Sequence, residues 1–173
     1  MRRDVVIRPA TFADRAAVLT IAAAGMREFG LEPDFHGLDA DIGRLGEARL
    51  DLVAELVAEV EEVVCGSVVL AAKVKGIGKL SGLYVDPAYR GRGIGRALLT
   101  AAVDAGRRTG LARLYLETWG KMTSAVHLYE SSGWVRGEDL PATSGADRSY
   151  SFELARLTPR SSGRASRAAQ RAR

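Results

Sequence analysis

The spacing of apolar residues changes several times along this chain of 173 residues, which predicts alternating strands and helices. Residues 4–8 alternate enough to predict a strand, and Pro9 closes it. Thr11 and Asp14 then resemble a capping box, which satisfies free N–H groups at the start of a helix. Helical spacing of small and apolar residues follows at Ala17, Val18, Ile21, Ala22 and Gly25. We therefore expect a strand and then a helix.

A loop and a second helix are expected next. Gly, Pro and Asp interrupt residues 30–38, which predicts a loop. Asp39 is of a type that caps helices, and helical spacing behind it involves Ile42, Leu45 and Ala48.

Residues 52–73 admit two interpretations. The stretch 53–60 could continue a helix, but valine dominates the segment, and β-branched residues favour strands. We interpret it as a hairpin that turns at Glu61 and Glu62.

The second half of the chain is more regular. Strands are expected at 79–86 and 111–118, on either side of a helix from about 93 to 108 that Gly110 ends. The apolar face of that helix consists of Ile94, Ala97, Leu98, Ala101, Ala102 and Ala105. A strand, a helix and a strand in this order imply a parallel crossover.

A short helix at 123–132 comes next, with Gly133 as its stop, and then strands that begin at Trp134 and Ser149. The order of elements predicts one mixed α/β (α+β) sheet domain over residues 1–155.

Composition agrees with one ordinary globular domain. Hydrophobic residues make up 47% of the chain and charged residues 27%. The sequence holds no run of 18 apolar residues and opens without the apolar core of a signal peptide, so we expect neither a membrane span nor secretion. The single cysteine, Cys65, lies in an apolar stretch and indicates a buried residue in a reducing compartment, the cytoplasm.

The net charge of +4 is unevenly placed. Residues 156–173 hold six arginines and no acidic residue, so this tail contributes +6 and leaves −2 on residues 1–155. The tail has almost no bulky apolar residue, which predicts a basic disordered segment. Its charge would allow weak contact with nucleic acid, and we expect no other nucleic-acid binding.

A glycine-rich turn carries the clearest chemistry. Gly91, Gly93 and Gly95 lie within five residues and open the helix at 93–108. Such a turn brings backbone N–H groups toward one point at a helix start, where the dipole favours an anion such as pyrophosphate. Arg90, Arg92 and Arg96 add cationic donors, so a turn that only reverses the chain explains the pattern less well.

A dinucleotide-binding fold is the main rival, because Glu117 lies where a ribose-binding acid would be expected. The spacing of the glycines argues against this fold, because the dinucleotide-binding motif Gly-x-Gly-x-x-Gly needs a third glycine. That position is Arg96 when counted from Gly91, and Leu98 when counted from Gly93. A P-loop is excluded because no Gly-Lys-Ser/Thr ends the turn.

The run Val85-Asp86-Pro87-x-Tyr89-Arg90-Gly91-x-Gly93-Ile94-Gly95-x-Ala97-Leu98 resembles the coenzyme-A motif of the GNAT (Gcn5-related N-acetyltransferase) superfamily. A second block, Ala125-Val126-His127-Leu128-Tyr129-Glu130-Ser131-Ser132-Gly133-Trp134, is similar to that family's Ala-x-x-Leu-Tyr-Glu-x-x-Gly-Phe. The order of elements also fits the family from residue 4 to about 155.

This resemblance implies a GNAT-like, mostly antiparallel sheet of six to seven strands with helices on both faces. A splayed parallel strand pair would hold acetyl-CoA, the co-substrate, and no metal is implied. The residues implied in coenzyme binding are Leu83, Tyr84, Val85, Arg90, Gly91, Arg92, Gly93, Ile94, Gly95 and Arg96.

The resemblance also implies direct attack of an amine on the thioester, with Tyr129 protonating the departing thiolate. A phenol stays protonated at neutral pH and can donate to sulfur. The alternative for Tyr129 is a helix residue that packs on the sheet. The matching function is an acetyl-CoA-dependent N-acetyltransferase, and the alternative is a non-catalytic acyl-CoA-binding sensor or interaction module of the same fold.

Two departures from the family pattern affect the site. Met122 stands where many members have an asparagine that touches the coenzyme. The acid that many relatives carry just ahead of the strand at 79–86 is missing, which leaves the base open between Glu117, directly or through water, and Glu59. Either glutamate could instead be solvated or ion-paired. Neither histidine is a strong candidate for the base, because His36 lies in the loop and His127 lies two positions from Tyr129 on the same helix.

The acceptor is a small-molecule or peptide amine that the sequence does not identify. Residues 25–50 and the loop from about 137 to 148 would border it. Acidic residues of the first segment would suit a cationic amine, and these are Glu28, Glu32, Asp34, Asp39 and Asp41. The pattern leaves a homodimer open.

Overall fold

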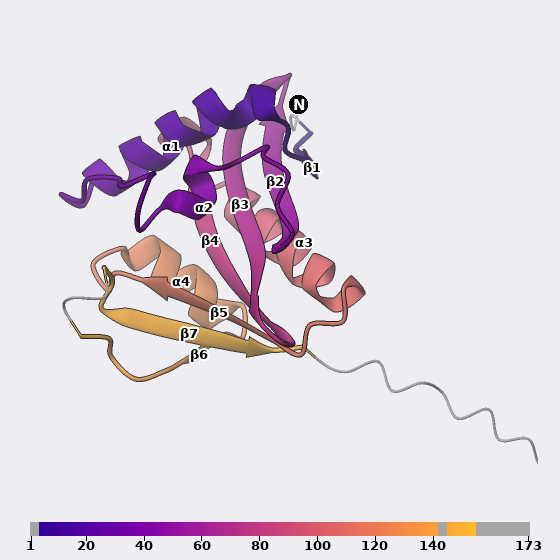
Figure 1. Ribbon diagram of the computed structural model, residues 1–173. Coiled ribbons are helices and arrows are strands. Elements are labelled where there is room, and N and C mark those ends of the chain that lie inside the picture. Colours follow the sequence, from indigo (N-terminus) through magenta and orange to yellow (C-terminus); the bar gives the residue numbers. More distant parts are fainter. Residues whose placement is uncertain (1–3, 142–144, 155–173) are drawn as a thin grey trace, which may run out of the picture.

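The computed structural model describes residues 4–141 and 145–154, which form a seven-stranded mixed sheet with helices on both faces (Figure 1). The strands are β1 (Val6–Pro9), β2 (Leu52–Val60), β3 (Val63–Val74), β4 (Ile77–Val85), β5 (Arg113–Thr118), β6 (Val135–Arg136) and β7 (Arg148–Glu153). The helices are α1 (Arg15–Arg27), α2 (Ala40–Gly43), α3 (Ile94–Arg108) and α4 (Thr123–Ser131), with 3₁₀ turns η1 (Phe12–Asp14) and η2 (Pro87–Tyr89). The tail predicted at 156–173 lies outside the described residues.

The sheet order is β1-β2-β3-β4-β5-β7-β6, and every neighbouring pair is antiparallel except β4 and β5. The predicted mixed sheet and its parallel pair are therefore confirmed. The parallel pairing joins residues 77–79 to 113–115, and within the described residues it goes no further. Figure 1 shows the two strands diverging from that point, so that a wedge opens between β4 and β5.

Side chains alternate between two cores, one on each face of the sheet. Along β3, Val68 and Leu70 pack with α3 and α4, whereas Val69 between them packs with α1 and α2. Successive side chains of a strand point to opposite faces, so a continuous apolar run such as β3 is expected where both faces are covered. In Figure 1, α1 and α2 lie on the front face and α3 on the back.

The hairpin predicted at 52–73 is confirmed as β2 and β3, which pair through Val60 and Val63 around the turn. Glu61 and Glu62 both adopt positive φ, 50° and 64°. A two-residue turn of this kind matches the twist of the strands, although Asn-Gly is its usual sequence.

The second helix is shorter than predicted. α2 ends at Gly43, so Leu45 and Ala48 lie beyond it, and Ala48 is exposed. Gly46 adopts a φ of +80° and turns the chain away, and its N–H donates to Glu55 Oε2 at 2.8 Å. Ile42, within α2, and Leu45, in the loop after it, are nevertheless both buried, because they pack in one cluster with α1 and the sheet.

No helix of the part of the chain that the structure describes is both long enough and apolar enough to span a membrane.

Candidate active site

The glycine-rich turn leads into α3 as predicted. Asp86 accepts a hydrogen bond from the backbone N–H of Ala88 at 2.8 Å and starts the short turn η2. Gly91 and Gly93 then adopt φ of +74° and +78°, the left-handed region in which a Cβ is strained. Gly93 is the N-cap of α3, and its carbonyl accepts the first helical hydrogen bond, from Ala97 at 3.0 Å. The N–H groups of the first turn are left without helical partners.

A cavity of about 410 Å³ lies beside this turn. It is lined by nine of the ten residues predicted to bind the coenzyme, which are Leu83, Tyr84, Val85, Arg90, Gly91, Gly93, Ile94, Gly95 and Arg96. The tenth, Arg92, is not part of the lining: it donates to the Ala88 carbonyl at 3.2 Å and stacks over the Tyr89 ring. The cavity therefore combines a helix start with two arginines, which suits an anion.

Both of those arginines are held by neighbours. Arg90 pairs with both carboxylate oxygens of Glu28, at 2.8 and 3.0 Å, and donates to the Val85 carbonyl at 3.1 Å. Arg96 donates to the hydroxyls of Ser131 and Ser132 at 2.9 and 3.1 Å. Glu28 offsets the charge of Arg90, so the backbone N–H groups and Arg96 provide most of the attraction for an anion.

Tyr129 lies in the wedge between the splayed strands. It lines a small cavity of about 50 Å³ together with residues of β4 and β5. Its ring packs between Trp134 and Tyr150, with centroids 6.0 and 5.7 Å away, and only 5% of the residue is exposed. Burial raises the pKa of the Tyr129 phenol above its ordinary value, so that the hydroxyl keeps its proton.

A third cavity, of about 230 Å³, lies on the α1–α2 side of the wedge. Most of its wall comes from residues 26–42 and from β4 and β5, and the other lining residues are Trp119, Met122, Gly145 and Ala146. Residues 26–42 and 145–146 belong to the two segments that the sequence predicted to border the acceptor. Tyr84 and Met122 line all three cavities, so they stand where the spaces meet. Thr118 Oγ1 lies 3.9 Å from the Met122 sulfur.

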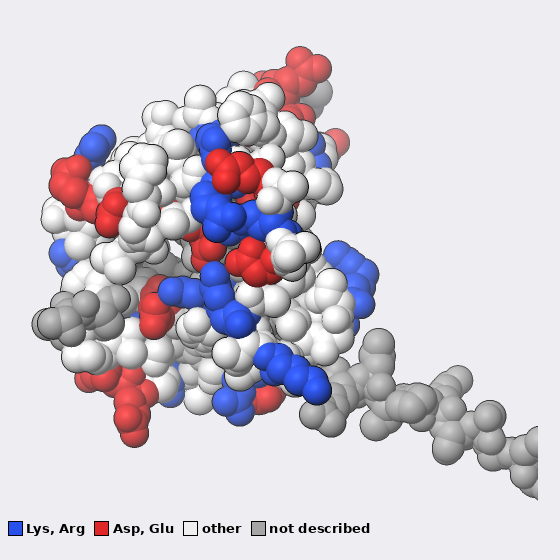
Figure 2. Space-filling view, in the orientation of Figure 1, with Lys and Arg blue, Asp and Glu red and all other residues white. Residues whose placement is uncertain are grey.

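Five carboxylates line this third cavity, and three of them have cationic partners. Glu32 pairs with Arg27 at 3.2 Å, and Glu117 pairs with Lys79 at 2.9 Å. Burial alone would lower the pKa of Lys79, but the hydrogen bond and charge of Glu117 raise it overall. Figure 2 shows acidic and basic side chains side by side on this face of the molecule.

Asp41 is compensated more fully than the others. It binds Arg49 at 2.9 Å and Lys73 at 3.2 Å. Burial would raise the pKa of its carboxyl, but these two cations lower it overall. Arg49 also reaches Glu55 at 3.2 Å and is almost fully buried, so this network ties α2 to β2.

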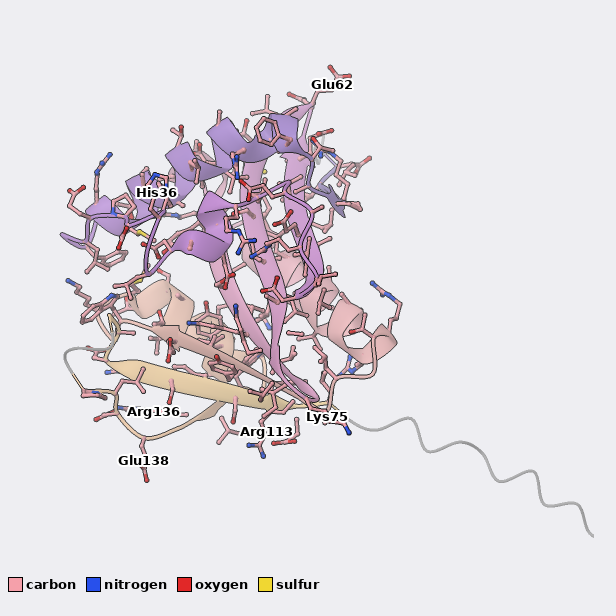
Figure 3. All side chains as sticks on the ribbon, viewed as in Figure 1. His36, Glu62, Lys75, Arg113, Arg136 and Glu138 are labelled. Atoms are coloured by element: carbon pink, nitrogen blue, oxygen red, sulfur yellow. The ribbon has the colours of Figure 1, made fainter. Side chains whose placement is uncertain are left out.

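Of the two glutamates weighed as bases, neither is free. Glu117 lines the cavity but is ion-paired with Lys79. Glu59 lies on β2 in an ion pair with Arg8, 2.7 Å away, and lines none of the three cavities. Both glutamates are therefore ion-paired, which was the alternative to a role as base. His127 is exposed, and His36 projects from the loop between α1 and α2 (Figure 3).

Two residues that line the third cavity carried little signal in the sequence. Asp39 was predicted as a helix cap and as one of five acidic residues that would suit a cationic acceptor, and it lines this cavity. Ser81, on β4, has a buried hydroxyl oxygen without a hydrogen-bond partner among the described residues. Only the folding of the 30–38 loop against β4 brings them together, and no short motif carries that information.

Among the described residues, no three His, Cys, Asp or Glu side chains come close enough together to hold a metal ion.

Comparison with known proteins agrees with this geometry. The sequence model of the acetyltransferase (GNAT) family matches residues 24–134. An uncharacterized N-acetyltransferase of Escherichia coli K12, YjgM, is 31% identical over 135 residues, which cover 75% of this chain and 81% of that protein.

The ribosomal protein bS18-alanine N-acetyltransferase of the same organism is 38% identical over 72 residues. These cover 39% of this chain and 49% of that enzyme, so the chain matches about half of its length.

Among solved structures, yncA of Salmonella typhimurium, a putative acetyltransferase with its cofactor acetyl-CoA, has a TM-score of 0.71 at 23% identity. The alignment covers 90% of this chain and 97% of that one, and it shows the shared fold.

Proposed function

The chain belongs to the acetyltransferase (GNAT) family, and from this premise we propose that it transfers the acetyl group of acetyl-CoA to a primary amine. The observation that carries the proposal is that separate cavities on the donor and acceptor sides meet at Tyr84, Met122 and the wedge holding Tyr129. A thioester that reaches the wedge from one side would face an amine arriving from the other.

In this proposal, the turn from Arg90 to Arg96 binds the pyrophosphate of the coenzyme, mainly through N–H groups at the start of α3. The pantetheine arm lies along Leu83–Val85, on the side of β4 that β5 leaves unpaired. Backbone groups of Leu83 and Val85 are available there for the amides of the arm. Met122 packs against the arm in place of the hydrogen bond that an asparagine would make.

The reaction is direct attack by the neutral amine on the thioester carbon. The C–N bond forms, the C–S bond breaks, and the electron pair of that bond remains on the sulfur. Tyr129 donates its proton to this sulfur as the charge develops, the amine nitrogen loses one proton to a base, and exchange with solvent restores the phenol. Holding both reactants in one wedge removes translational freedom before the reaction, which in well-oriented cases lowers the barrier by roughly 7–11 kcal/mol.

The acceptor is proposed to be a small-molecule or peptide amine. The relatives support an amine in general. The bS18-alanine N-acetyltransferase suggests one candidate, a peptide that begins with alanine. The buried, reduced Cys65 supports a place in the cytoplasm.

Two measurements on the full chain test this function. Acetyl-CoA at 100 times its Kd should stabilise the fold by about 2.7 kcal/mol, or about 5–10 °C in Tm. Release of free thiol is then followed with a panel of amines: 1,4-diaminobutane, an alanine-terminated peptide and glycine. Stabilisation together with thiol release supports the enzyme. Stabilisation without release from any of a broad set of amines would favour the acyl-CoA-binding module instead.

A matched pair of variants checks that the ligand binds at the turn. Gly93 and Gly110 lie at opposite ends of α3 with φ of +78° and +77°, and no atom lies within 4 Å of a Cβ at either position. Valine should therefore strain the backbone about equally, by about 1–2 kcal/mol. Only Gly93 lines the donor cavity. Gly93→Val should abolish stabilisation by acetyl-CoA while Gly110→Val keeps it; equal loss in both would exclude the turn as the binding site.

A further inference from the structure

The base of the proposed transfer remains to be found, because β4 lacks an acid at its start and both glutamates weighed for the role are ion-paired. Asp34 and Asp39 are the two carboxylates of the acceptor cavity without an ion-pair partner among the described residues, and Asp39 is the more buried of the two. It follows the loop 30–38, precedes α2 and lines the acceptor cavity. Its Oδ2 accepts a hydrogen bond from the backbone N–H of Asp34 at 2.9 Å. Its other oxygen has no hydrogen-bond partner within 4–141 and 145–154, so it is available to a ligand.

Charged groups surround Asp39 on several elements. Asp34 lies on the same loop, Asp41 on α2, Lys79 and Tyr84 on β4, and Glu117 on β5. The charges of Asp41 and Glu117 are matched by Arg49 and Lys73 and by Lys79. Asp34 and Asp39 have no ion-pair partner among the described residues, so this end of the cavity carries uncompensated negative charge. Such a cavity attracts an ammonium group.

Ser81 gives an independent sign of a polar ligand. Its hydroxyl oxygen is fully buried and has no hydrogen-bond partner among the described residues. The residue lines both the acceptor cavity and the small cavity that holds Tyr129. A buried hydroxyl without a partner is costly unless a ligand or a water molecule satisfies it. A nitrogen held by Asp39 and Ser81 would lie between the acceptor cavity and the wedge.

We propose that Asp39 is the general base of the transfer and binds the amino group of the acceptor together with Ser81. The inference rests on the proposed function. The bound ammonium first loses one proton to solvent, and the neutral nitrogen then attacks the thioester carbon. As the C–N bond forms, the nitrogen passes a second proton to the free oxygen of Asp39. The C–S bond breaks toward sulfur, which takes the proton of Tyr129, and exchange with solvent restores both side chains.

The electrostatics of Asp39 agree with this role. Burial raises the pKa of its carboxyl above the ordinary value, and the charge of Asp34 adds to this, while the Asp34 N–H and Lys79 oppose it. A carboxylate with a raised pKa is a stronger base than an exposed one. The charge of Asp39 is also near enough to Tyr84 to add to the effect of burial, which raises the pKa of that phenol.

The test is Asp39→Asn in the full chain, assayed for thiol release with each amine that the wild type accepts. The asparagine carbonyl oxygen can still accept the Asp34 N–H, so the loop should keep its conformation. We expect kcat to fall by about 10²-fold or more, as for loss of a general base, and stabilisation by acetyl-CoA to stay unchanged. The ratio of wild-type to variant kcat/KM should fall as the pH drops and Asp39 takes up its proton.

Asp104→Asn is the control, because Asp104 pairs with Arg107 on an exposed face of α3 and lines none of the three cavities. It makes the same change of carboxylate to amide and should leave kcat and the acceptor KM unchanged. Activity of Asp39→Asn within threefold of wild type would overturn the proposal. A higher acceptor KM at unchanged kcat, with the ratio independent of pH, would also overturn it. A wild-type chain that binds acetyl-CoA but acetylates no amine would refute the proposed function itself, and with it any base.

Discussion

Tyr129 illustrates how single residues are held at this site. Trp134 and Tyr150 pack against its ring, with centroids 6.0 and 5.7 Å away, and the residue is 5% exposed. The ring contacts fix the phenol independently of its hydroxyl, and burial raises its pKa. The phenol thus holds its proton until negative charge develops on the sulfur, and the ring contacts position it for the proposed transfer.

Tyr129→Phe should therefore lower kcat by about 10²-fold and leave acetyl-CoA stabilisation unchanged, because the ring contacts remain. Tyr150→Phe is the control: that hydroxyl donates to Glu130 at 2.9 Å, on the neighbouring helix. The control should lose about 1 kcal/mol of stability and keep its turnover. Thiol release and thermal melts measure both. Wild-type turnover in Tyr129→Phe would contradict the role as acid.

The residues of the site differ in how far they could be predicted from the sequence. Tyr129 and the glycines at 91 and 93 belong to short motifs, and a local pattern is enough to find them. Asp39 belongs to no motif, and its chemistry arises from burial against β4. Glu117 is a similar case, because its pairing with Lys79 depends on the register of β4 against β5.

The helices and strands in which apolar residues recur at regular spacing were predicted well. α3 begins and ends within a residue of its prediction, because Gly93 and Gly110 mark its ends with positive φ. α2 was predicted too long, since Gly46 turns the chain and Arg49 is drawn into ion pairs with Asp41 and Glu55. The turn and these ion pairs override a weak helical spacing, and Asp41 also lines the acceptor cavity.

The hairpin of β2 and β3 offers a test at this scale. Glu62 adopts a φ of 64° at the exposed tip of the turn (Figure 3). A non-glycine residue there costs about 1–2 kcal/mol, and the flexibility of glycine in the unfolded chain offsets part of any gain. Glu62→Gly should therefore raise the free energy of unfolding by about 0.5–1 kcal/mol, as measured in urea. Glu62→Ala removes the same charge and keeps the strain; an equal gain in that variant would contradict the explanation.

The whole molecule is built around the wedge between β4 and β5. On one side of it, strands β1–β4 pack with α1, α2 and the acceptor loop. On the other side, β5 supplies Glu117 and the neighbouring helix α4 supplies Tyr129. The candidate active site thus lies where the two parts of one sheet separate. The order of elements predicted the parallel pair and the resemblance to the family implied its splaying, but neither identified Ser81 among the residues that line the wedge.

Ion pairs hold the edge strand β1 to the rest of the sheet, and they make the stability of the whole molecule depend on pH. Arg8 on β1 binds both oxygens of Asp14 at 2.9 Å and Glu59 on β2, so it joins the edge strand, the start of α1 and the hairpin. The hydrogen bonds from Arg8 lower the pKa of the Asp14 carboxyl to about 2. Against about 3.9 in the unfolded chain, this shift stabilises the fold above pH 4 and is lost as the pH falls toward 2.

Asp14→Asn should therefore cost about 1–2 kcal/mol at pH 7, a value reduced by solvent screening at the partly exposed Arg8. The variant should also lose less stability than the wild type between pH 4 and pH 2, because it has no carboxyl to protonate. Urea unfolding across this range measures both effects. Asp104→Asn, at an exposed pair with Arg107, is the control and should follow the wild type. Parallel curves for Asp14→Asn and the wild type would show that Asp14 does not govern the acid limb, and that the edge strand is held by its backbone pairing with β2 instead.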